Sequence, residues 1–411
     1  MTKWPIVEYG TLAASDRSAF SMGPFGSKLT QQDYIASGVP LTRGVNLSRG
    51  IFHDADFVFI SPEKADEVKA ANVGPGDLIF THRGTIGQVS MIPRNPRFER
   101  YVVCSSQVKT RLDPSKAIPE YYYYWFRSPE GQRSILANSS TVGVPGIATP
   151  LTSIKHLRVP HPSIRDQIKI AAVLGALDDK IVINDRIART EEEILRAGFD
   201  ALQIDVEPAT LADGIRACDL VHFNPRVRTP KEDAPYLEMA SLPTDYARVS
   251  SWTRRLPKSG TKFVNGDTVM ARITPCLENG KTAYIDFLEE GEVAIGSTEF
   301  IVMRARAGYP SHLPYFLARS PRFRDQAIRN MVGSSGRQRV AASSLEDFPL
   351  SRPVDGTIAS FGNEAASFFA HMKSLDREAT VLAELRDTLL PKLMSGEIKV
   401  RDVEKVVEGA L

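Results

Sequence analysis

The sequence predicts an α+β protein in which two globular α/β domains are separated by two long antiparallel helices that form a coiled coil, with a pseudo-twofold internal repeat. Three observations support this fold class. The 411 residues exceed what one hydrophobic core normally holds. Motifs recur in the same order in the two halves of the chain. Each half ends in a long stretch with an apolar stripe at helical spacing.

The two halves are displaced by about 190 residues. In each half a Gly-Asp turn, Gly76-Asp77 or Gly266-Asp267, leads into an apolar strand that opens into a glycine-bearing loop. Downstream, Ser106-Gln107-Val108 corresponds to Thr298-Glu299-Phe300. A short helix then ends in a shared tripeptide, Arg127-Ser128-Pro129 or Arg319-Ser320-Pro321. The last strand of each half ends at Val159-Pro160 or Phe348-Pro349. The shared order predicts one module built twice.

Two stretches are predicted to form the long helices. The first, from Ser163 to about Leu202, has no proline and carries its stripe at three-and-four spacing. The second, from Phe361 to Leu393, keeps a heptad-like rhythm with a gap at Arg386. At about 1.5 Å per residue both are longer than a domain is wide, so we expect spacers that pair with each other. The residues predicted to pair them are Ile170, Leu174, Leu177, Ile181, Phe368, Met372, Leu375 and Leu382.

Two points about these helices stay open at this level. They could pack onto the domains as an ordinary bundle, although the duplicated order argues against it. Asn184 falls on the first stripe, where it either fixes the register of the pair or lies at its solvent edge.

Bulk properties restrict the class of protein. Hydrophobic residues make up 42%, charged residues 24% and the mean hydropathy is −0.19, as in a folded protein in water. No window approaches the roughly 18 apolar residues of a membrane span, and no secretory signal is recognisable, so a cytoplasmic location is expected. The three cysteines lie too far apart to suggest a metal site or a disulfide framework. A net charge of +2 permits nucleic-acid binding without requiring it.

A search for catalytic motifs finds none. The Gly-rich segment from Gly23 to Lys28 is too short for a P-loop that wraps a triphosphate. No glycine fingerprint follows a first strand, and Asn224-Pro225-Arg226 lacks the Pro-aromatic pair of an amino-methyltransferase. The seven histidines show no paired spacing for zinc. The chain is therefore predicted to bind no cofactor or metal and not to be an enzyme, with a nuclease or transferase of unrecognised motifs as the alternative.

The loops instead combine Arg and Lys with Ser, Thr, Asn, Gln and Gly, the side chains that contact phosphates and base edges. The sharpest case is Ser334 to Arg339, because Arg and Gln are bidentate readers of guanine and adenine. An arginine on a surface loop can equally be merely solvated. The candidate DNA contacts are Lys28, Arg43, Arg49, Arg83, Thr85, Ser139 and Ser140 in the first half and Arg272, Thr274, Lys281, Ser334, Arg337, Gln338 and Arg339 in the second.

Two similar readers held in inverted orientation would meet two separated half-sites on one DNA duplex. The sequence therefore predicts a protein that reads a bipartite sequence in double-stranded DNA. A coiled-coil scaffold whose domains bind proteins is a second hypothesis. Salt-dependent binding of duplex DNA separates the two, because phosphate contacts impose a steep dependence on salt.

These residues carry a resemblance to a known family. The passage from Val159 to Ile168 with Leu174, Leu177 and Asp178, and the ending from Leu389 to Glu397, resemble the specificity subunit of type I restriction-modification systems. The resemblance spans nearly the whole chain. It includes the two Gly-Asp turns and the segment from Gly23 to Ser27.

The resemblance implies target-recognition domains at 1–160 and 206–355, a central spacer helix at 161–205, and a C-terminal spacer helix and tail at 356–411. It also implies two modification subunits that bring S-adenosylmethionine and methylate adenine, and restriction subunits that use ATP and magnesium to translocate and cleave DNA. The junction from Pro349 to Phe361 departs from the pattern because it lacks the glutamine-bearing passage of the first junction. Base-reading loops vary within such families, so no base assignment carries over.

Overall fold

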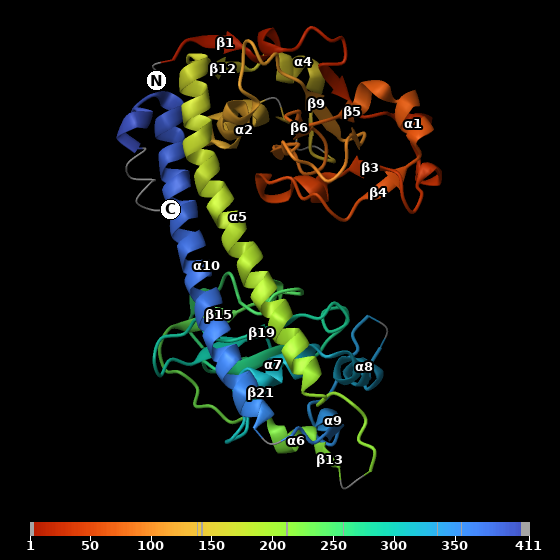
Figure 1. The fold of residues 1–411 in the computed structure, drawn as a ribbon, viewed down its shortest axis with the longest axis vertical. Helices are drawn as coiled ribbons and strands as arrows, with labels where there is room; N and C mark the ends of the chain where they lie inside the picture. The colour runs from red at the N-terminus through yellow and green to blue at the C-terminus, as the bar shows by residue number, and fades with distance from the viewer. Residues whose placement is uncertain are drawn as a thin grey trace. The chain divides into compact units, whose positions relative to one another are not determined.

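The computed structural model describes residues 4–137, 139–140, 143–210, 213–257, 259–334, 336–354 and 356–403, without the side chains of residues 27 and 48–50. The chain divides into two compact units (Figure 1). Unit 1 consists of Met1–Val182 and Glu378–Leu411, and unit 2 of Ile183–Arg377. Each long helix therefore contributes one half to each unit.

Unit 1 is built, within its described residues, on two four-stranded sheets whose strand orders are β2-β9-β6-β7 and β4-β3-β8-β5. Strands β3 and β8 are parallel, and the other paired strands of the unit are antiparallel. Two short ladders, β1-β12 and β10-β11, complete the unit. The strands are β1 (Ile6–Glu8), β2 (Phe20–Met22), β3 (Val39–Thr42), β4 (Val58–Ile60), β5 (Asn72–Val73), β6 (Leu78–Thr81), β7 (Val89–Met91), β8 (Tyr101–Val103), β9 (Gln107–Thr110), β10 (Ser139–Ser140), β11 (Gly146–Ile147) and β12 (Arg158–Pro160).

Unit 2 repeats the two four-stranded sheets and the terminal ladder of unit 1. Its sheets have the orders β14-β21-β18-β19 and β16-β15-β20-β17, with β15 and β20 parallel, and β13 pairs with β22 as β1 pairs with β12. The strands are β13 (Gly214–Arg216), β14 (Val221–Phe223), β15 (Ala234–Leu237), β16 (Thr253–Arg255), β17 (Thr261–Phe263), β18 (Asp267–Ala271), β19 (Thr282–Tyr284), β20 (Ala294–Gly296), β21 (Phe300–Ala305) and β22 (Pro349–Ser351). The predicted internal repeat is therefore real.

Short helices occupy matching places in the two units. The shared Arg-Ser-Pro tripeptide marks the point where one helix ends and the next begins. Ser128 and Ser320 each donate a hydrogen bond to a carbonyl of the helix that ends, and the following proline starts the next helix, where its missing N–H is harmless. These helices are α1 (Pro62–Glu67), α2 (Pro119–Arg127), α3 (Pro129–Leu136), α4 (Pro150–Lys155), α6 (Ala217–Leu220), α7 (Leu313–Arg319), α8 (Pro321–Arg329) and α9 (Ser343–Glu346). The 3-10 turns are η1 (Tyr9–Leu12), η2 (Gly26–Lys28), η3 (Gln31–Asp33), η4 (Gly44–Gly50), η5 (Lys69–Ala71) and η6 (Met239–Ser241).

The two Gly-Asp turns adopt one geometry. Gly76 and Gly266 have φ values of +82° and +87°, in the region that favours glycine. The carboxylate that follows each glycine accepts a bond from the backbone N–H of Gly74 or Val264 and two bonds from an arginine on the neighbouring strand. These arginines are Arg111 on Asp77, at 2.6 and 2.8 Å, and Arg304 on Asp267, also at 2.6 and 2.8 Å.

Helices α5 (Ile164–Ala201) and α10 (Thr357–Ser395) pair antiparallel inside each unit. In unit 1, Asp178 on α5 binds Arg386 on α10 at 2.5 Å, and Lys180 binds Glu378 at 3.5 Å. In unit 2, Glu191 meets His371, and the ring of Phe199 lies 6.3 Å from that of Phe361. As residue numbers rise along α5 they fall along α10, which confirms the predicted antiparallel pair.

Most residues predicted to pair the helices are buried. Ile170, Leu174, Leu177, Met372, Leu375 and Leu382 belong to the cores of their units, and Ile181 and Phe368 pack against those cores while partly exposed. Phe369, adjacent to Phe368, is the more deeply buried ring and contacts Tyr284 and Phe316. Asn184 is only 1% exposed, so it lies inside the pair and not at its solvent edge. The gap at Arg386 is filled by an ion pair.

The start of α5 follows the sequence signal. Ser163 accepts a bond from the backbone N–H of Asp166, as an N-cap should. The Gln167 side chain accepts a bond from the Ile118 N–H at the start of α2 and donates to the Pro162 carbonyl, so it fastens the helix to the domain. In the part of the chain that the structure describes, no helix is long and apolar enough to cross a membrane.

Candidate nucleic-acid interface

Three segments of unit 1 meet beyond the end of β6. The loop that leaves β6 donates from His82 N–H to the Ser106 carbonyl at 2.9 Å, beside the turn that enters β9. The same loop donates from Gly84 N–H to the Pro145 carbonyl and accepts from Ile147 N–H, both at 2.8 Å, which attaches the β10-β11 hairpin. We call residues 82–88, 104–106, 139–140 and 143–147 loop surface 1.

Unit 2 makes the same surface with the same hydrogen bonds. Arg272 N–H donates to the Glu299 carbonyl at 3.0 Å, and Thr274 N–H donates to the Gln338 carbonyl at 3.1 Å. Val340 N–H donates to the Arg272 carbonyl at 2.9 Å. We call residues 272–281, 297–299, 332–334 and 336–340 loop surface 2.

These bonds correct one part of the sequence match. Because His82 and Arg272 hold equivalent places, Ser106 corresponds to Glu299. The sequence comparison had paired Ser106 with Thr298, which is one residue out of register. In a strand, a shift of one residue exchanges the two faces, so the ladder and not side-chain similarity decides the equivalence.

Loop surface 1 brings several candidate residues together. Arg83 and Thr85 are exposed on the loop after β6, and Arg83 forms a β-bridge with Gly146. Across that bridge lie Ser139, half-buried, and Ser140, exposed, on β10. Arg83 and Ser140 therefore both lie opposite Gly146, and Thr85 and Ser139 are close to them along the chain.

Lys28 reaches the same region through a neighbouring segment. It is exposed at the end of η2, and the nearby exposed ring of Phe25 lies 6.3 Å from the ring of His82. The segment passes very close to the turn after β8, because a Cβ on Gly23 would lie 1.9 Å from the Cys104 carbonyl oxygen. Glycine is therefore required at Gly23 to lay Phe25 and Lys28 beside the loop.

Arg43 does not join this group of exposed side chains. Its guanidinium donates to the Asp56 carbonyl at 2.8 Å, and its backbone N–H donates to the Asn46 side chain. Both contacts stabilise its own loop. The side chain of Arg49 lies outside the described residues.

In loop surface 2, the second-half candidates fall into two groups. Ser334 and Arg337 are exposed at the turn of the hairpin, and Gln338 is half-buried beside them. The others are already engaged. Lys281 donates to the Met239 carbonyl at 2.7 Å, Thr274 accepts a bond from Gln338 N–H at 3.2 Å, and Arg339 is ion-paired with Glu299 at 2.7 Å. Arg272 is half-buried close to Glu299.

Sequence reasoning missed two cations of unit 2. Arg226 and Arg228 are exposed on the segment between β14 and β15. That segment corresponds to the one between β2 and β3, which carries Phe25 and Lys28. The signal was available in the sequence, because both segments follow matching strands, but the side chains at corresponding places differ.

The charge state of the interface follows from its contacts. Hydrogen bonds from Arg339 lower the pKa of Glu299, and the positive charge of Arg272 lowers it further, so the carboxylate is ionised at neutral pH. Burial lowers the pKa of His82, which favours its neutral form. Among the described residues, no group of three or more His, Cys, Asp and Glu side chains is placed to hold a metal ion.

The fold and the two loop surfaces define a class of protein: one with two similar α/β units, each of which presents a polar surface with cations that can bind a ligand of the same kind. Residues 33–192 match the family model described as the type I restriction modification DNA specificity domain. The predicted resemblance to type I restriction-modification specificity subunits is confirmed.

Curated relatives extend the likeness beyond the first half. The MjaIX specificity subunit of a type I restriction enzyme of Methanocaldococcus jannaschii is 23% identical, with 85% of each chain covered. The EcoEI specificity subunit of Escherichia coli is 24% identical over 54% of this chain and 40% of the relative, and the E. coli EcoAI specificity subunit is 27% identical over 41% and 31%. Each of these names describes a specificity subunit.

A solved structure shares the fold. The S subunit of the type I restriction-modification system of M. genitalium has a TM-score of 0.55 at 13% identity, covering 95% of this chain and 96% of that one. This likeness confirms the predicted fold class of two α/β domains with paired long helices.

Proposed function

We propose that this chain is the DNA sequence-recognition subunit of a type I restriction-modification complex and that it reads a bipartite target, one half-site with each unit. The observation that carries the proposal is that the same three-segment loop surface is built twice, with the same backbone hydrogen bonds and different side chains. A repeated backbone with altered side chains is what two readers of two different short sequences require.

The exposed polar side chains supply the chemistry for reading. In unit 1, Arg83 with Thr85 and Ser140 would contact the first half-site, and Lys28 would bind phosphate nearby. In unit 2, Arg337 and Gln338 would read base edges in the major groove, since Arg suits guanine and Gln suits adenine. Arg226 and Arg228 are added as phosphate contacts of the second half-site.

The domain boundaries given above and the spacer role of the helices belong to this proposal. So does the docking of two modification subunits, which would bring S-adenosylmethionine, and of restriction subunits that use ATP and magnesium. A face of α5 in unit 2 suits such docking, because Ile183, Ile187 and Ile194 are exposed at spacings that place them on one side of the helix. Exposed apolar stripes of this kind are typical of partner contacts.

The test uses the full chain purified together with a modification subunit. The complex is incubated with genomic DNA and S-adenosylmethionine, and methylated adenines are mapped. The expected result is one motif in two parts separated by a fixed gap. Methylation without a two-part motif would contradict the proposal.

A second measurement separates DNA reading from a protein scaffold. Binding of the full chain to duplex DNA that carries the mapped motif is titrated at several salt concentrations. Phosphate contacts predict an affinity that falls steeply as salt rises. Arg83→Ala and Arg337→Ala should each weaken the preference at one half-site only, while Arg43→Ala is a matched control whose side chain serves its own loop. Equal loss at both half-sites would contradict the assignment of one unit to each.

A further inference from the structure

Arg339 stands out among the candidate readers because one edge of its guanidinium is already engaged within the protein. Its Nε lies 2.9 Å from both carboxylate oxygens of Glu299, and its Nη2 lies 2.7 Å from Oε1. Its Nη1 donates to the Arg337 carbonyl at 3.2 Å. Glu299 occupies the Nε–Nη2 edge of the guanidinium and the Arg337 carbonyl takes one Nη1 hydrogen, so only the Nη1–Nη2 end could still face another group.

Glu299 is fixed from its own side as well. Its backbone carbonyl accepts from Arg272 N–H, and its own N–H donates to the Ser297 hydroxyl at 3.2 Å. The carboxylate therefore has a defined place at the entry to β21, between the two arginines Arg272 and Arg339. A fork-to-fork arrangement fixes the orientation of both groups as well as their separation.

The pair stands at the base of the turn that carries the free readers. The backbone of Arg339 exchanges hydrogen bonds with Val332 at 2.9 and 3.0 Å, which closes the hairpin. Inside it, Arg337 N–H donates to the Ser334 carbonyl, and Gln338 N–H donates to the Thr274 hydroxyl. With the backbone held at these points, the side chains of Arg337 and Gln338 project from a turn whose base is fixed by the ion pair.

Unit 1 has no such pair at this place. The residues equivalent to Arg339 and Glu299 are Gly146 and Ser106, as their backbone hydrogen bonds show. The ion pair is therefore an addition to loop surface 2 and not part of the shared frame. Both side chains are partly exposed, at 41% and 24%, and such pairs contribute little to stability. The role of the ion pair is therefore better sought in the orientation of the hairpin that it holds.

We propose that Arg339 and Glu299 are positioning residues for recognition of the second half-site: they set the turn from which Arg337 and Gln338 contact bases. This inference rests on the proposed function. Under this inference, the base preference of unit 2 depends partly on the Glu299 carboxylate, although a carboxylate by itself is repelled by the DNA phosphates.

The test is a charge exchange in the full chain. Four variants are compared with the wild type: Glu299→Gln, Arg339→Gln, Arg337→Gln and the double exchange Glu299→Arg with Arg339→Glu. Each is used to select duplexes from a library randomised at both half-sites, and the preference at every position is measured. Thermal unfolding of each variant is the control for folding.

The expected result is specific. Glu299→Gln and Arg339→Gln each reduce preference at the second half-site by about tenfold and leave the first unchanged, and the double exchange restores most of it. Arg337→Gln removes the preference for one base pair. If Glu299→Gln leaves the preference at the second half-site intact, or if the double exchange rescues nothing, the inference is overturned.

Two further outcomes are decisive. If the exchanged chain does not fold, Glu299→Gln alone carries the test, because it keeps the shape of the side chain and removes only its charge. If the wild type selects no sequence while the fold is intact, the proposed function fails and this inference fails with it. If the wild type selects a bipartite sequence but Glu299→Gln changes nothing, only the inference fails.

Discussion

The two units have one backbone frame but fill it differently at corresponding places. Both share the sheet orders, the parallel strand pair and the Asp-Arg brace between neighbouring strands. At the centre of the first sheet of unit 1, however, Lys109 is only 1% exposed, whereas Val302 holds the equivalent place in unit 2. This difference shows that backbone hydrogen bonds maintain the repeated fold, whereas the side chains packed between the two sheets can differ from one unit to the other.

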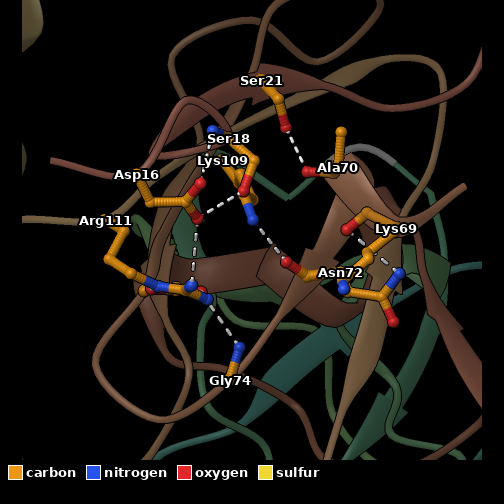
Figure 2. A network of polar contacts seen from close by, with 10 residues as sticks. Asp16, Ser18, Ser21, Lys69, Ala70, Asn72, Gly74, Lys109 and Arg111 are labelled. Carbon is orange, nitrogen blue, oxygen red and sulfur yellow. Dashed lines mark hydrogen bonds and ion pairs between the residues drawn. The ribbon is translucent and has the colours of Figure 1, made fainter. Parts of the chain in front are cut away.

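Figure 2 shows how unit 1 accommodates its buried lysine. Lys109 Nζ donates to the Asn72 carbonyl at 2.6 Å, and the hydroxyl of Ser21 on the adjacent strand donates to the Ala70 carbonyl. The two donors attach one sheet to the segment that enters the other. Arg111 lies beside Asp16 in the same region, 3.8 Å away. In unit 2, Val302 instead joins an apolar cluster with Phe263 and Ile285.

The contacts between the paired helices also differ in the two units. In unit 1, the Asp178 carboxylate is shared by Arg386 and Arg127 at 2.5 and 3.0 Å, and the Tyr124 hydroxyl donates to it at 2.9 Å. All three ionic groups are largely buried. In unit 2, an ion pair between the same two helices joins Glu191 to His371, whose ring is half-exposed.

The largest effect should follow from breaking the buried pair. Asp178→Asn leaves two buried arginines without their carboxylate, which costs about 3–5 kcal/mol. Glu191→Gln in unit 2 is the matched control and should cost less, about 1 kcal/mol, because the partner His371 is 51% exposed and water can replace the lost contact. Hydrogen exchange of peptides from each unit measures the two losses separately. Equal losses would mean that the burial difference has no energetic consequence.

The next effect depends on pH and is confined to unit 2. His312 is buried, with its ring 4.6 Å from Tyr284 and 4.5 Å from Phe369, and burial lowers its pKa from 6.5 to about 4. Between pH 6.5 and pH 4 the unfolded chain is therefore protonated at His312 while the folded chain is mostly not. The free energy of unfolding is unaffected by His312 above pH 6.5 and decreases as the pH falls, by roughly 3 kcal/mol at pH 4.

Comparison of the wild type with His312→Phe isolates this contribution, because other groups titrate in both proteins. The difference in protection of unit 2 peptides should grow as the pH falls from 6.5 to 4, with the variant becoming relatively more stable. In unit 1 the residue at the N-cap of the matching helix is Ile118, which does not titrate, so peptides of unit 1 should show no such trend. A matching trend in unit 1 would argue against the assignment to His312.

A third experiment tests the shared brace. Asp77→Asn and Asp267→Asn each remove charge-assisted bonds from an arginine, and each should cost about 2 kcal/mol in its own unit. The two values should agree, because the geometry is the same in both units. Hydrogen exchange again gives the loss for each unit. If the two losses of unfolding free energy differ by more than about 2 kcal/mol, the Asp-Arg contacts of the two units are not energetically equivalent.

The smallest effect is expected for Lys109→Met, which gives unit 1 an apolar residue like the one in unit 2. Burial lowers the pKa of Lys109, so the folded chain holds its proton less tightly than the unfolded chain. The wild type should therefore gain stability, relative to the variant, as the pH rises toward 10.5. Chemical unfolding from pH 7 to pH 10 measures the trend. A constant difference across this range would mean that Lys109 keeps its proton without a penalty.

Much of the fold could be predicted because it depends on local patterns. The Gly-Asp turns, the Arg-Ser-Pro helix junction and the apolar stripes each need particular residues at fixed spacing, so they are visible along the chain. The candidate interface was predicted only in outline. Arg83, Thr85 and Ser140 do share a surface, but composition alone could not separate exposed Arg337 from ion-paired Arg339.

The sequence by itself determined the duplication, the two helical stretches and the loops that bear polar side chains, because periodicity and turn chemistry are properties of neighbouring residues. Only the tertiary structure decided the partners across the chain. It paired Ser106 with Glu299 as equivalents, filled the gap at Arg386 with Asp178, and committed Arg339 to a carboxylate 40 residues away. Such contacts join segments that are distant in sequence, and their geometry exists only once the sheets and helices have packed.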